Sequence, residues 1–176
     1  MKRLAKKLLC LVAVLTLSAS VLTGCKSKNE KTLFEYAGQK VTFQEAHVYA
    51  RIMQYQAEAQ YGSYFGDKMW STQVGTDSKG KKITMQDSVK SSVINQLKQI
   101  KVLAAHADDY KVKLTKAEKK QLKENVNAFV KDETGKKVMK KTEADKDAIT
   151  ALYKESMIAS KVMNAIIKKA NVSVSD

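Results

Sequence analysis

Proline is absent from the 176 residues of this chain, and glycine occurs only seven times. These two residues supply many of the tight turns in β-sandwiches and β-barrels, so their scarcity argues against both architectures. Proline also interrupts helices, and its absence favours long ones. Because 44% of the residues are hydrophobic, the chain can still bury a core. The sequence therefore predicts one mainly all-α domain built from several helices.

Cysteine and histidine are also scarce, with two of each. A zinc site made of these ligands is therefore excluded. His47 and His106 fall on separate predicted helices, and the acidic pairs at 108–109 and 132–133 fall at predicted helix ends, where hydration accounts for them. The sequence has no G-x-S-x-G, no phosphate-binding glycine loop and no H-E-x-x-H. We predict no catalytic residues, no metal site and no cofactor, and hence no enzyme.

Acidic residues are outnumbered, with 18 Asp and Glu against 32 Lys and Arg, which gives a net charge of +14. The lysine pairs are spread along the chain and do not gather on one element. Binding to nucleic acid needs a concentrated basic patch. We therefore expect a solvated basic face and no nucleic-acid partner.

The beginning of the chain has the organisation of an export signal. Residues 1–7, MKRLAKK, carry four positive charges and no acid, and residues 8–21 form an uncharged, mostly apolar run. A run of this length is shorter than the roughly 20 residues of a transmembrane helix, but it suits a secretory signal. We expect a signal peptide at residues 1–24.

The apolar run ends in Leu22-Thr23-Gly24-Cys25. This sequence resembles the bacterial lipobox, whose cysteine receives a diacylglycerol thioether before the signal is cleaved. Once the signal is removed, Cys25 is the only thiol and has no partner for an internal disulfide. The alternative is an ordinary signal peptide with an incidental cysteine. We expect lipidation at Cys25, a tether over residues 25–32 that spans about 25 Å when extended, and attachment to the extracytoplasmic face of the cell membrane.

Capping patterns divide the rest of the chain. A small β-hairpin is predicted around Gly38, from residues 33–36 and 40–42. Thr42-x-x-Glu45 resembles a capping box, in which hydroxyl and carboxylate each accept a bond from the other residue's backbone. It opens a helix over 43–61 that ends at Gly62 or Gly66, followed by an irregular loop over 63–83.

Three further caps follow. Thr84-x-x-Asp87 opens a long helix whose apolar stripe runs from Met85 to Tyr110. Thr115-x-x-Glu118 opens another, and a lysine-rich stretch follows around Gly135. Thr142-x-x-Asp145 opens the last helix, and residues 172–176 form a polar tail.

Large apolar side chains are placed where they can serve either as core or as binding surface. The loop and the end of the helix before it carry aromatic and methionine side chains, which suit adaptable contacts with other polypeptides. The residues that we consider for client binding are Met53, Tyr61, Tyr64, Phe65, Met69 and Trp70. Core packing is the competing interpretation for each of them.

The order of these features resembles the amino-terminal helical domain of the SurA/PrsA group of exported foldases, which are related to trigger factor. The resemblance rests on the lipobox, FEYAGQKVTFQEA, YGSYFGDKMW and the passage MQDSVKSSVINQLKQIKVLAAHADDYKVKLT. It covers most of residues 33–170 and implies a helical domain over 33–171 that binds unfolded exported chains. Relatives also carry a parvulin domain with prolyl isomerase activity, but no stretch of this chain has its strand pattern.

Two functions are therefore considered. The first is a membrane-anchored, extracytoplasmic holdase for unfolded or partly folded exported polypeptides, without an isomerase module. The alternative is a lipid-anchored adaptor that binds one folded envelope partner. The resemblance also implies that a helix completing the domain is missing after residue 171, so we expect an uncovered apolar face and possible self-association.

Overall fold

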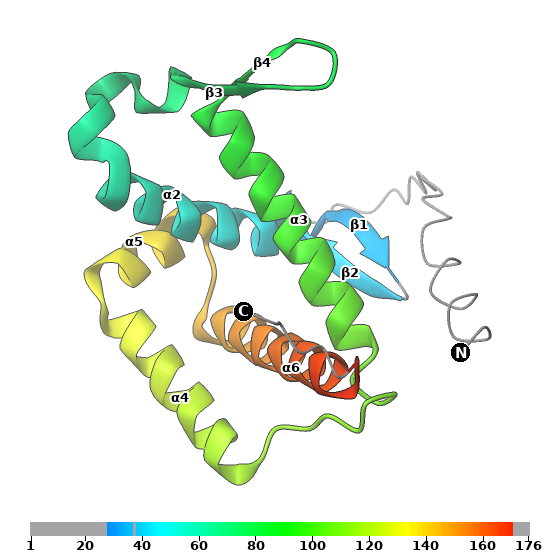
Figure 1. Ribbon diagram of the computed structural model, residues 1–176. Coiled ribbons are helices and arrows are strands. Elements are labelled where there is room, and N and C mark those ends of the chain that lie inside the picture. Colours follow the sequence, from blue (N-terminus) through cyan, green and yellow to red (C-terminus); the bar gives the residue numbers. More distant parts are fainter. Residues whose placement is uncertain (1–27, 37, 171–176) are drawn as a thin grey trace, which may run out of the picture.

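The computed structural model describes residues 28–36 and 38–170. The chain begins with a 3-10 turn, η2 (Lys28–Glu30), and an antiparallel hairpin of β1 (Thr32–Tyr36) and β2 (Gln39–Thr42). The helices of this part of the chain are α2 (Phe43–Phe65), α3 (Met85–Ala105), α4 (Lys116–Lys131), α5 (Glu133–Thr142) and α6 (Lys146–Ala170). The mainly helical fold with a small hairpin at its start is confirmed (Figure 1).

Several sequence predictions lie outside the described residues. These are the signal peptide at 1–24, the lipidation site Cys25 and the polar tail at 172–176. The expected tether at 25–32 overlaps the folded part of the chain, since Lys28–Glu30 forms η2 and β1 begins at Thr32. None of the helices in the described ranges is long and apolar enough to cross a membrane.

Three of the four predicted caps open helices. The hydroxyls of Thr42, Thr84 and Thr115 each accept a hydrogen bond from the backbone N–H three residues later, at 3.1–3.2 Å. Thr84 and Thr115 form complete capping boxes with Asp87 and Glu118. At Thr42 the hydroxyl half of the box is present, and the Glu45 carboxylate also lies beside a buried lysine of α3.

The predicted cap at Thr142 is also wrong. Thr142 is the last residue of α5, and its hydroxyl donates to the carbonyl of Val138 inside that helix. The side chain of Asp145 accepts from the N–H of Ala148 at 2.8 Å and so caps α6. The lysine-rich stretch around Gly135 is therefore a short helix of its own, opened by the side chain of Asp132.

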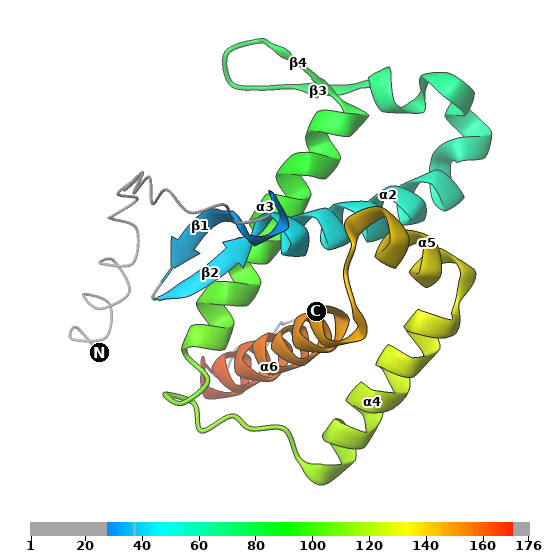
Figure 2. The same cartoon turned by 180° about the vertical axis from the view of Figure 1, so that it is seen from behind.

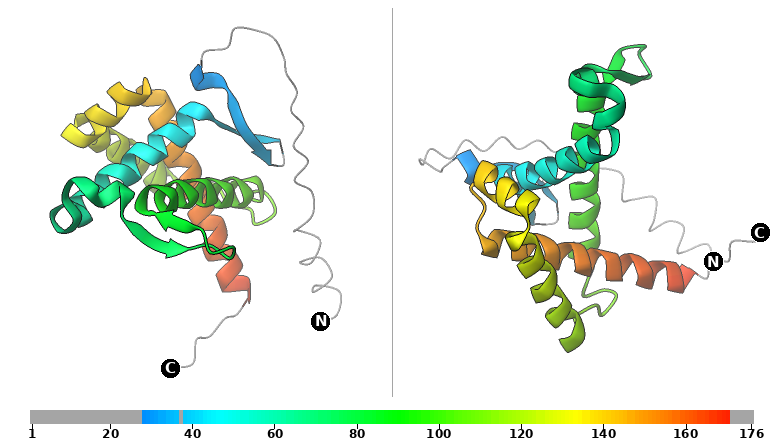
Figure 3. Two further views of the ribbon diagram at one scale, coloured as in Figure 1. Left: turned by 90° about the horizontal axis from the view of Figure 1, so that it is seen from above. Right: turned by 90° about the vertical axis from the view of Figure 1, so that its left-hand side faces the viewer.

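The segment after α2 is not an irregular loop. A 3-10 turn, η3 (Gly66–Ser71), leads into a second antiparallel hairpin made of β3 (Gln73–Thr76) and β4 (Lys82–Thr84). We call residues 61–84 the arm, and Figure 3 shows that it extends beyond the packed helices. Likewise α3 ends at Ala105, before the predicted Tyr110, and turns follow through Lys111, whose φ is positive.

The helices pack as a ring. α2 contacts α3 and α5, α6 contacts α3 and α4, and α4 contacts α5, as Figures 1 and 2 show from opposite sides. The interior of the ring holds the larger core cluster: Val48, Leu122, Val126, Val138, Ala144, Ile149 and Leu152. A smaller cluster joins the first hairpin to α2 and α3: Val41, Ala46, Val93 and Leu97. Burial of these apolar side chains, at about 25 cal/mol per Å², is the main force that closes the ring.

Candidate functional site

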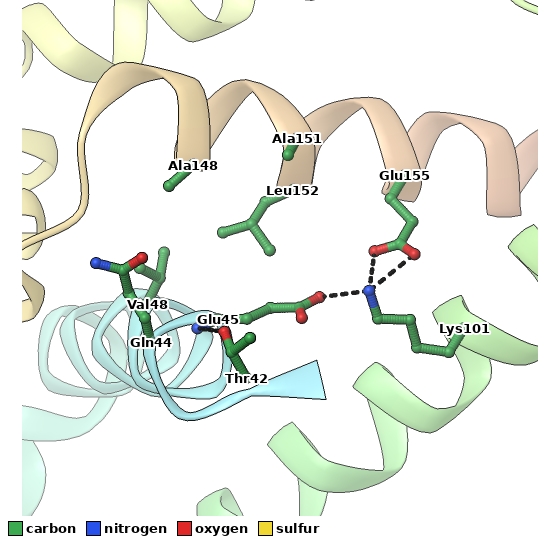
Figure 4. Close-up of a pocket in the computed structure, with 9 residues that line it drawn as sticks. All are labelled: Thr42, Gln44, Glu45, Val48, Lys101, Ala148, Ala151, Leu152 and Glu155. Atoms are coloured by element: carbon green, nitrogen blue, oxygen red, sulfur yellow. Dashed lines mark hydrogen bonds and ion pairs between the residues drawn. The ribbon is translucent and has the colours of Figure 1, made fainter. Parts of the chain in front are cut away.

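A buried charge cluster lies where three helices of the ring approach one another. Lys101, near the end of α3, places its Nζ 2.9 and 2.7 Å from the two carboxylate oxygens of Glu155 on α6. The same Nζ lies 3.0 Å from Glu45 Oε1 in the first turn of α2. The side chains of Lys101, Glu45 and Glu155 are only 8%, 11% and 18% exposed. The cluster therefore ties three separate helices together (Figure 4).

The two carboxylates do not share the lysine equally. Glu155 accepts two hydrogen bonds from Nζ, whereas the buried Oε1 of Glu45 has the ion-pair distance without an aligned hydrogen bond. Burial raises the pKa of Glu45, and the Lys101 charge only partly offsets this. Burial by itself lowers the pKa of Lys101, but the hydrogen bonds to Glu155 and the close contact with the Glu45 carboxylate reverse that effect, and the pKa is raised. With both carboxylates ionised, the cluster has one negative charge in excess.

A hydroxyl pair lies next to the cluster, one turn after Glu45 on α2 and at the residue after Glu155 on α6. The hydroxyls of Tyr49 and Ser156 are hydrogen-bonded to each other, and burial raises the pKa of Tyr49. The pair lies next to the apolar core, where an unpaired hydroxyl would be costly. It gives the space between α2 and α6 a second polar contact besides the charge cluster.

Two partly open cavities lie between α2 and α6. The first is about 170 Å³ and includes the charge cluster in its wall together with Ala148, Ala151 and Leu152. The second is about 190 Å³ and is mostly apolar; its wall is formed by Val48, Tyr49, Ile52, Ile149, Leu152, Tyr153 and Ser156. Val48 and Leu152 belong to both walls, so the cavities adjoin, and we call them together the α2/α6 groove. Figure 4 shows the charged end of this groove.

The arm carries a second candidate surface. Tyr61, Tyr64 and Phe65 are spaced as neighbours on one face of the last turns of α2, and they are 37%, 82% and 40% exposed. Val74 on β3 is 45% exposed. We call the three aromatic residues at the end of α2 the arm patch. An exposed group of large apolar side chains is a common feature of binding surfaces.

The remaining predicted client-binding residues are not part of that patch. Met69 is buried, at 3% exposure, and serves to pack η3 against the helices. Trp70 is half-buried and donates from Nε1 to Glu58 at 3.3 Å. Met53 packs against the smaller core cluster. These three side chains therefore hold the arm and α2 in place.

Each of the two histidines contacts a residue that lies close to it in the sequence. His47 accepts a hydrogen bond from Arg51 one turn later at 3.2 Å, and His106 pairs with Asp109 at 2.7 Å. Across residues 28–36 and 38–170, no three His, Cys, Asp or Glu side chains come together in a way that could hold a metal ion.

Sequence reasoning missed the charge cluster. Glu45 was assigned to a cap, and Lys101 follows the buried positions Val93, Leu97 and Ile100 on the inner face of α3. A lysine one turn after Leu97, within an apolar stripe, was the available signal, because such a lysine needs a carboxylate partner.

Comparisons of the chain with protein-family models, with curated proteins and with solved structures found no match.

Proposed function

We propose that this chain is a membrane-anchored, extracytoplasmic holdase that binds unfolded exported polypeptides, as the resemblance to the SurA/PrsA helical domain implies. The observation that carries the proposal is the arm patch. Tyr64 lies between Tyr61 and Phe65 on the same face of α2, and it is 82% exposed. Packing against the core therefore does not explain the position of this large side chain. Aromatic side chains at such positions bind apolar segments of many sequences.

The position of the arm patch suits a chaperone held at a membrane. The proposed lipid on Cys25 is three residues before η2, and η2 contacts α2. The backbone N–H of Phe43, the first residue of α2, donates to the carbonyl of Lys31. Three extended residues span about 10 Å. The arm patch is at the other end of the 23-residue helix α2, about 34 Å away at 1.5 Å per residue. An anchor at one end of α2 therefore leaves the patch free for clients.

Anchoring has its own test. Replacing Cys25 with Ser should release the chain from the membrane fraction or leave it as uncleaved precursor. Mass spectrometry of the unchanged chain should find an acylated amino-terminal cysteine. Membrane retention of the Ser variant at the mature size, together with no acyl chain on the parent protein, would reject the anchor.

Binding to unfolded chains is tested with one labelled protein in two states. A reduced and carboxymethylated protein stays unfolded without denaturant, and its native form is the matched control. We expect fluorescence anisotropy to rise with the unfolded form and to stay unchanged with the native form. An adaptor would instead form a saturable complex with one folded partner from the envelope and would ignore the unfolded probe.

The proposal assigns no prolyl isomerase reaction to the helical domain. A parvulin site needs side chains that converge on a small sheet, whereas the described sheets are two separate hairpins of two strands each. An isomerase assay on a proline-containing peptide should give the uncatalysed rate. Clear acceleration by the purified chain would contradict this part of the proposal.

A further inference from the structure

The α2/α6 groove has a charged end whose charges do not balance. Glu45 and Glu155 face a single ammonium, that of Lys101. Among the described residues that line the two cavities, Lys101 is the one with a cationic side chain. A buried carboxylate without a full complement of partners is costly. One further positive charge would balance the cluster.

The contact of Glu45 with Lys101 is weaker than the contact of Glu155 with the same lysine. Its Oε1 is buried and is 3.0 Å from Lys101 Nζ, but it receives no aligned hydrogen bond. The lysine directs its bonds to Glu155, at 2.9 and 2.7 Å. Hydrogen bonds between ions are about twice as strong as those between neutral groups. A cationic group entering the groove would therefore meet a carboxylate whose contact with Lys101 is an ion pair without an aligned hydrogen bond.

The rest of the groove is apolar and large enough for a side chain. The cavity at the charged end is about 170 Å³, which corresponds to about six water molecules at ~30 Å³ each. That volume is enough for a lysine side chain together with its ammonium group. The adjoining cavity of about 190 Å³ is walled mainly by aliphatic and aromatic groups, among them Val48, Ile52 and Tyr153. One apolar residue can occupy it beside the cationic one.

Resting on the proposed function, we propose that the α2/α6 groove binds an apolar segment of an unfolded chain that carries a lysine or arginine. The cation lies at the charged end of the groove, next to the cluster of Glu45, Lys101 and Glu155, and the neighbouring apolar side chain lies against Ile52 and Tyr153. Charge complementarity determines the preference: a cationic residue neutralises the cluster, a neutral one leaves it unbalanced, and an acidic one adds to the repulsion. The groove thus selects which apolar segments are held.

The test uses the full chain in lipid nanodiscs and three fluorescent peptides. The peptides share one apolar sequence and carry lysine, norleucine or glutamate at the central position. We expect the lysine peptide to bind about tenfold more tightly than the norleucine peptide, and the glutamate peptide to bind most weakly. In Glu45→Gln the lysine preference should fall to within twofold. The matched control Glu124→Gln removes a carboxylate from an exposed ion pair on α4 and should keep the preference.

A blocking variant keeps the test independent of the charge cluster. Ala151 is exposed and lines the charged cavity from α6, so Ala151→Phe fills that space without disturbing the core. It should weaken binding of all three peptides. Equal binding of the lysine and norleucine peptides to the parent chain overturns the inference, as does an unchanged preference in folded Glu45→Gln. If the chain still suppresses aggregation, those results leave the holdase proposal intact. A lysine preference without any suppression of aggregation rejects the holdase proposal and supports the proposed specificity of the groove.

Discussion

The ammonium of Lys101 lies 2.9 and 2.7 Å from the two carboxylate oxygens of Glu155, and this contact fastens α3 to α6 inside the ring of helices. Both groups are largely withdrawn from water. The cluster therefore contributes to stability only while all of its members are present. Removal of one member would leave a remaining charge buried without a partner.

Replacing Lys101 with Met should strongly destabilise the protein. The change leaves the carboxylates of Glu45 and Glu155 buried without a cation, and losing one partner of a buried pair costs about 3–5 kcal/mol. Urea unfolding at pH 7, followed by circular dichroism, measures the change. The control Lys98→Met, on the exposed side of α3, should change the free energy of unfolding by less than about 0.5 kcal/mol. Equal stability of the two variants would show that the cluster is not structurally important.

The sequence predicts local features of this fold better than distant ones. The caps at Thr84 and Thr115 could be predicted because hydroxyl, carboxylate and backbone lie within four residues. The charge cluster could not, because Lys101 and Glu155 are 54 residues apart and meet only after α3 packs on α6. The α2/α6 groove depends on the same packing.

The burial of α2 could not be read from the sequence for another physical reason, because α2 packs on two sides. Ala46, Ala50 and Met53 face the hairpin and α3, while Val48 and Ile52 face the interior of the ring. A helix buried on two sides loses the simple periodicity of an amphipathic one. The helix α5 was missed because Gly135 and the surrounding lysines resemble a turn.

The pair of Glu118 and Lys161 should make stability depend on acidic pH. Lys161 Nζ lies 2.7 and 2.6 Å from the Glu118 oxygens, and its hydrogen bond, with those from Thr115, lowers the pKa of Glu118 from 4.5 to about 2. Because the folded state lowers the pKa, the stabilisation is present above pH 4.5 and is lost as the pH falls towards 2.

Urea unfolding of the parent chain and of Glu118→Gln between pH 7 and pH 2 tests this pair. The parent should be more stable at neutral pH, and the difference should vanish towards pH 2. Glu124→Gln, also on α4, controls for the loss of one negative charge. A stability difference that stays constant across the whole range would refute the assignment.

Two glycines on helices should respond in opposite directions to alanine. A Cβ at Gly135 would lie 1.8 Å from the carbonyl oxygen of Phe129, so Gly135→Ala forces the junction of α4 and α5 apart. We expect a loss of about 1–3 kcal/mol or more. A Cβ at Gly62 in α2 meets nothing within 4 Å, and Gly62→Ala should stabilise by about 0.4–1 kcal/mol. Thermal unfolding of both variants decides whether the close packing at Gly135 is present.

Light scattering measures whether the arm patch holds unfolded polypeptides. A chemically unfolded, unrelated protein is diluted into buffer with residues 26–176, whose helical fold is first checked by circular dichroism. We predict that scattering falls as this domain is added, and that Tyr64→Ser with Phe65→Ser at least halves the suppression. Leu33→Ser, which removes an exposed apolar group from β1 at 48% exposure, should leave suppression unchanged. Scattering that is unaffected by the domain, or reduced equally by the domain with and without the two arm substitutions, would contradict the claim.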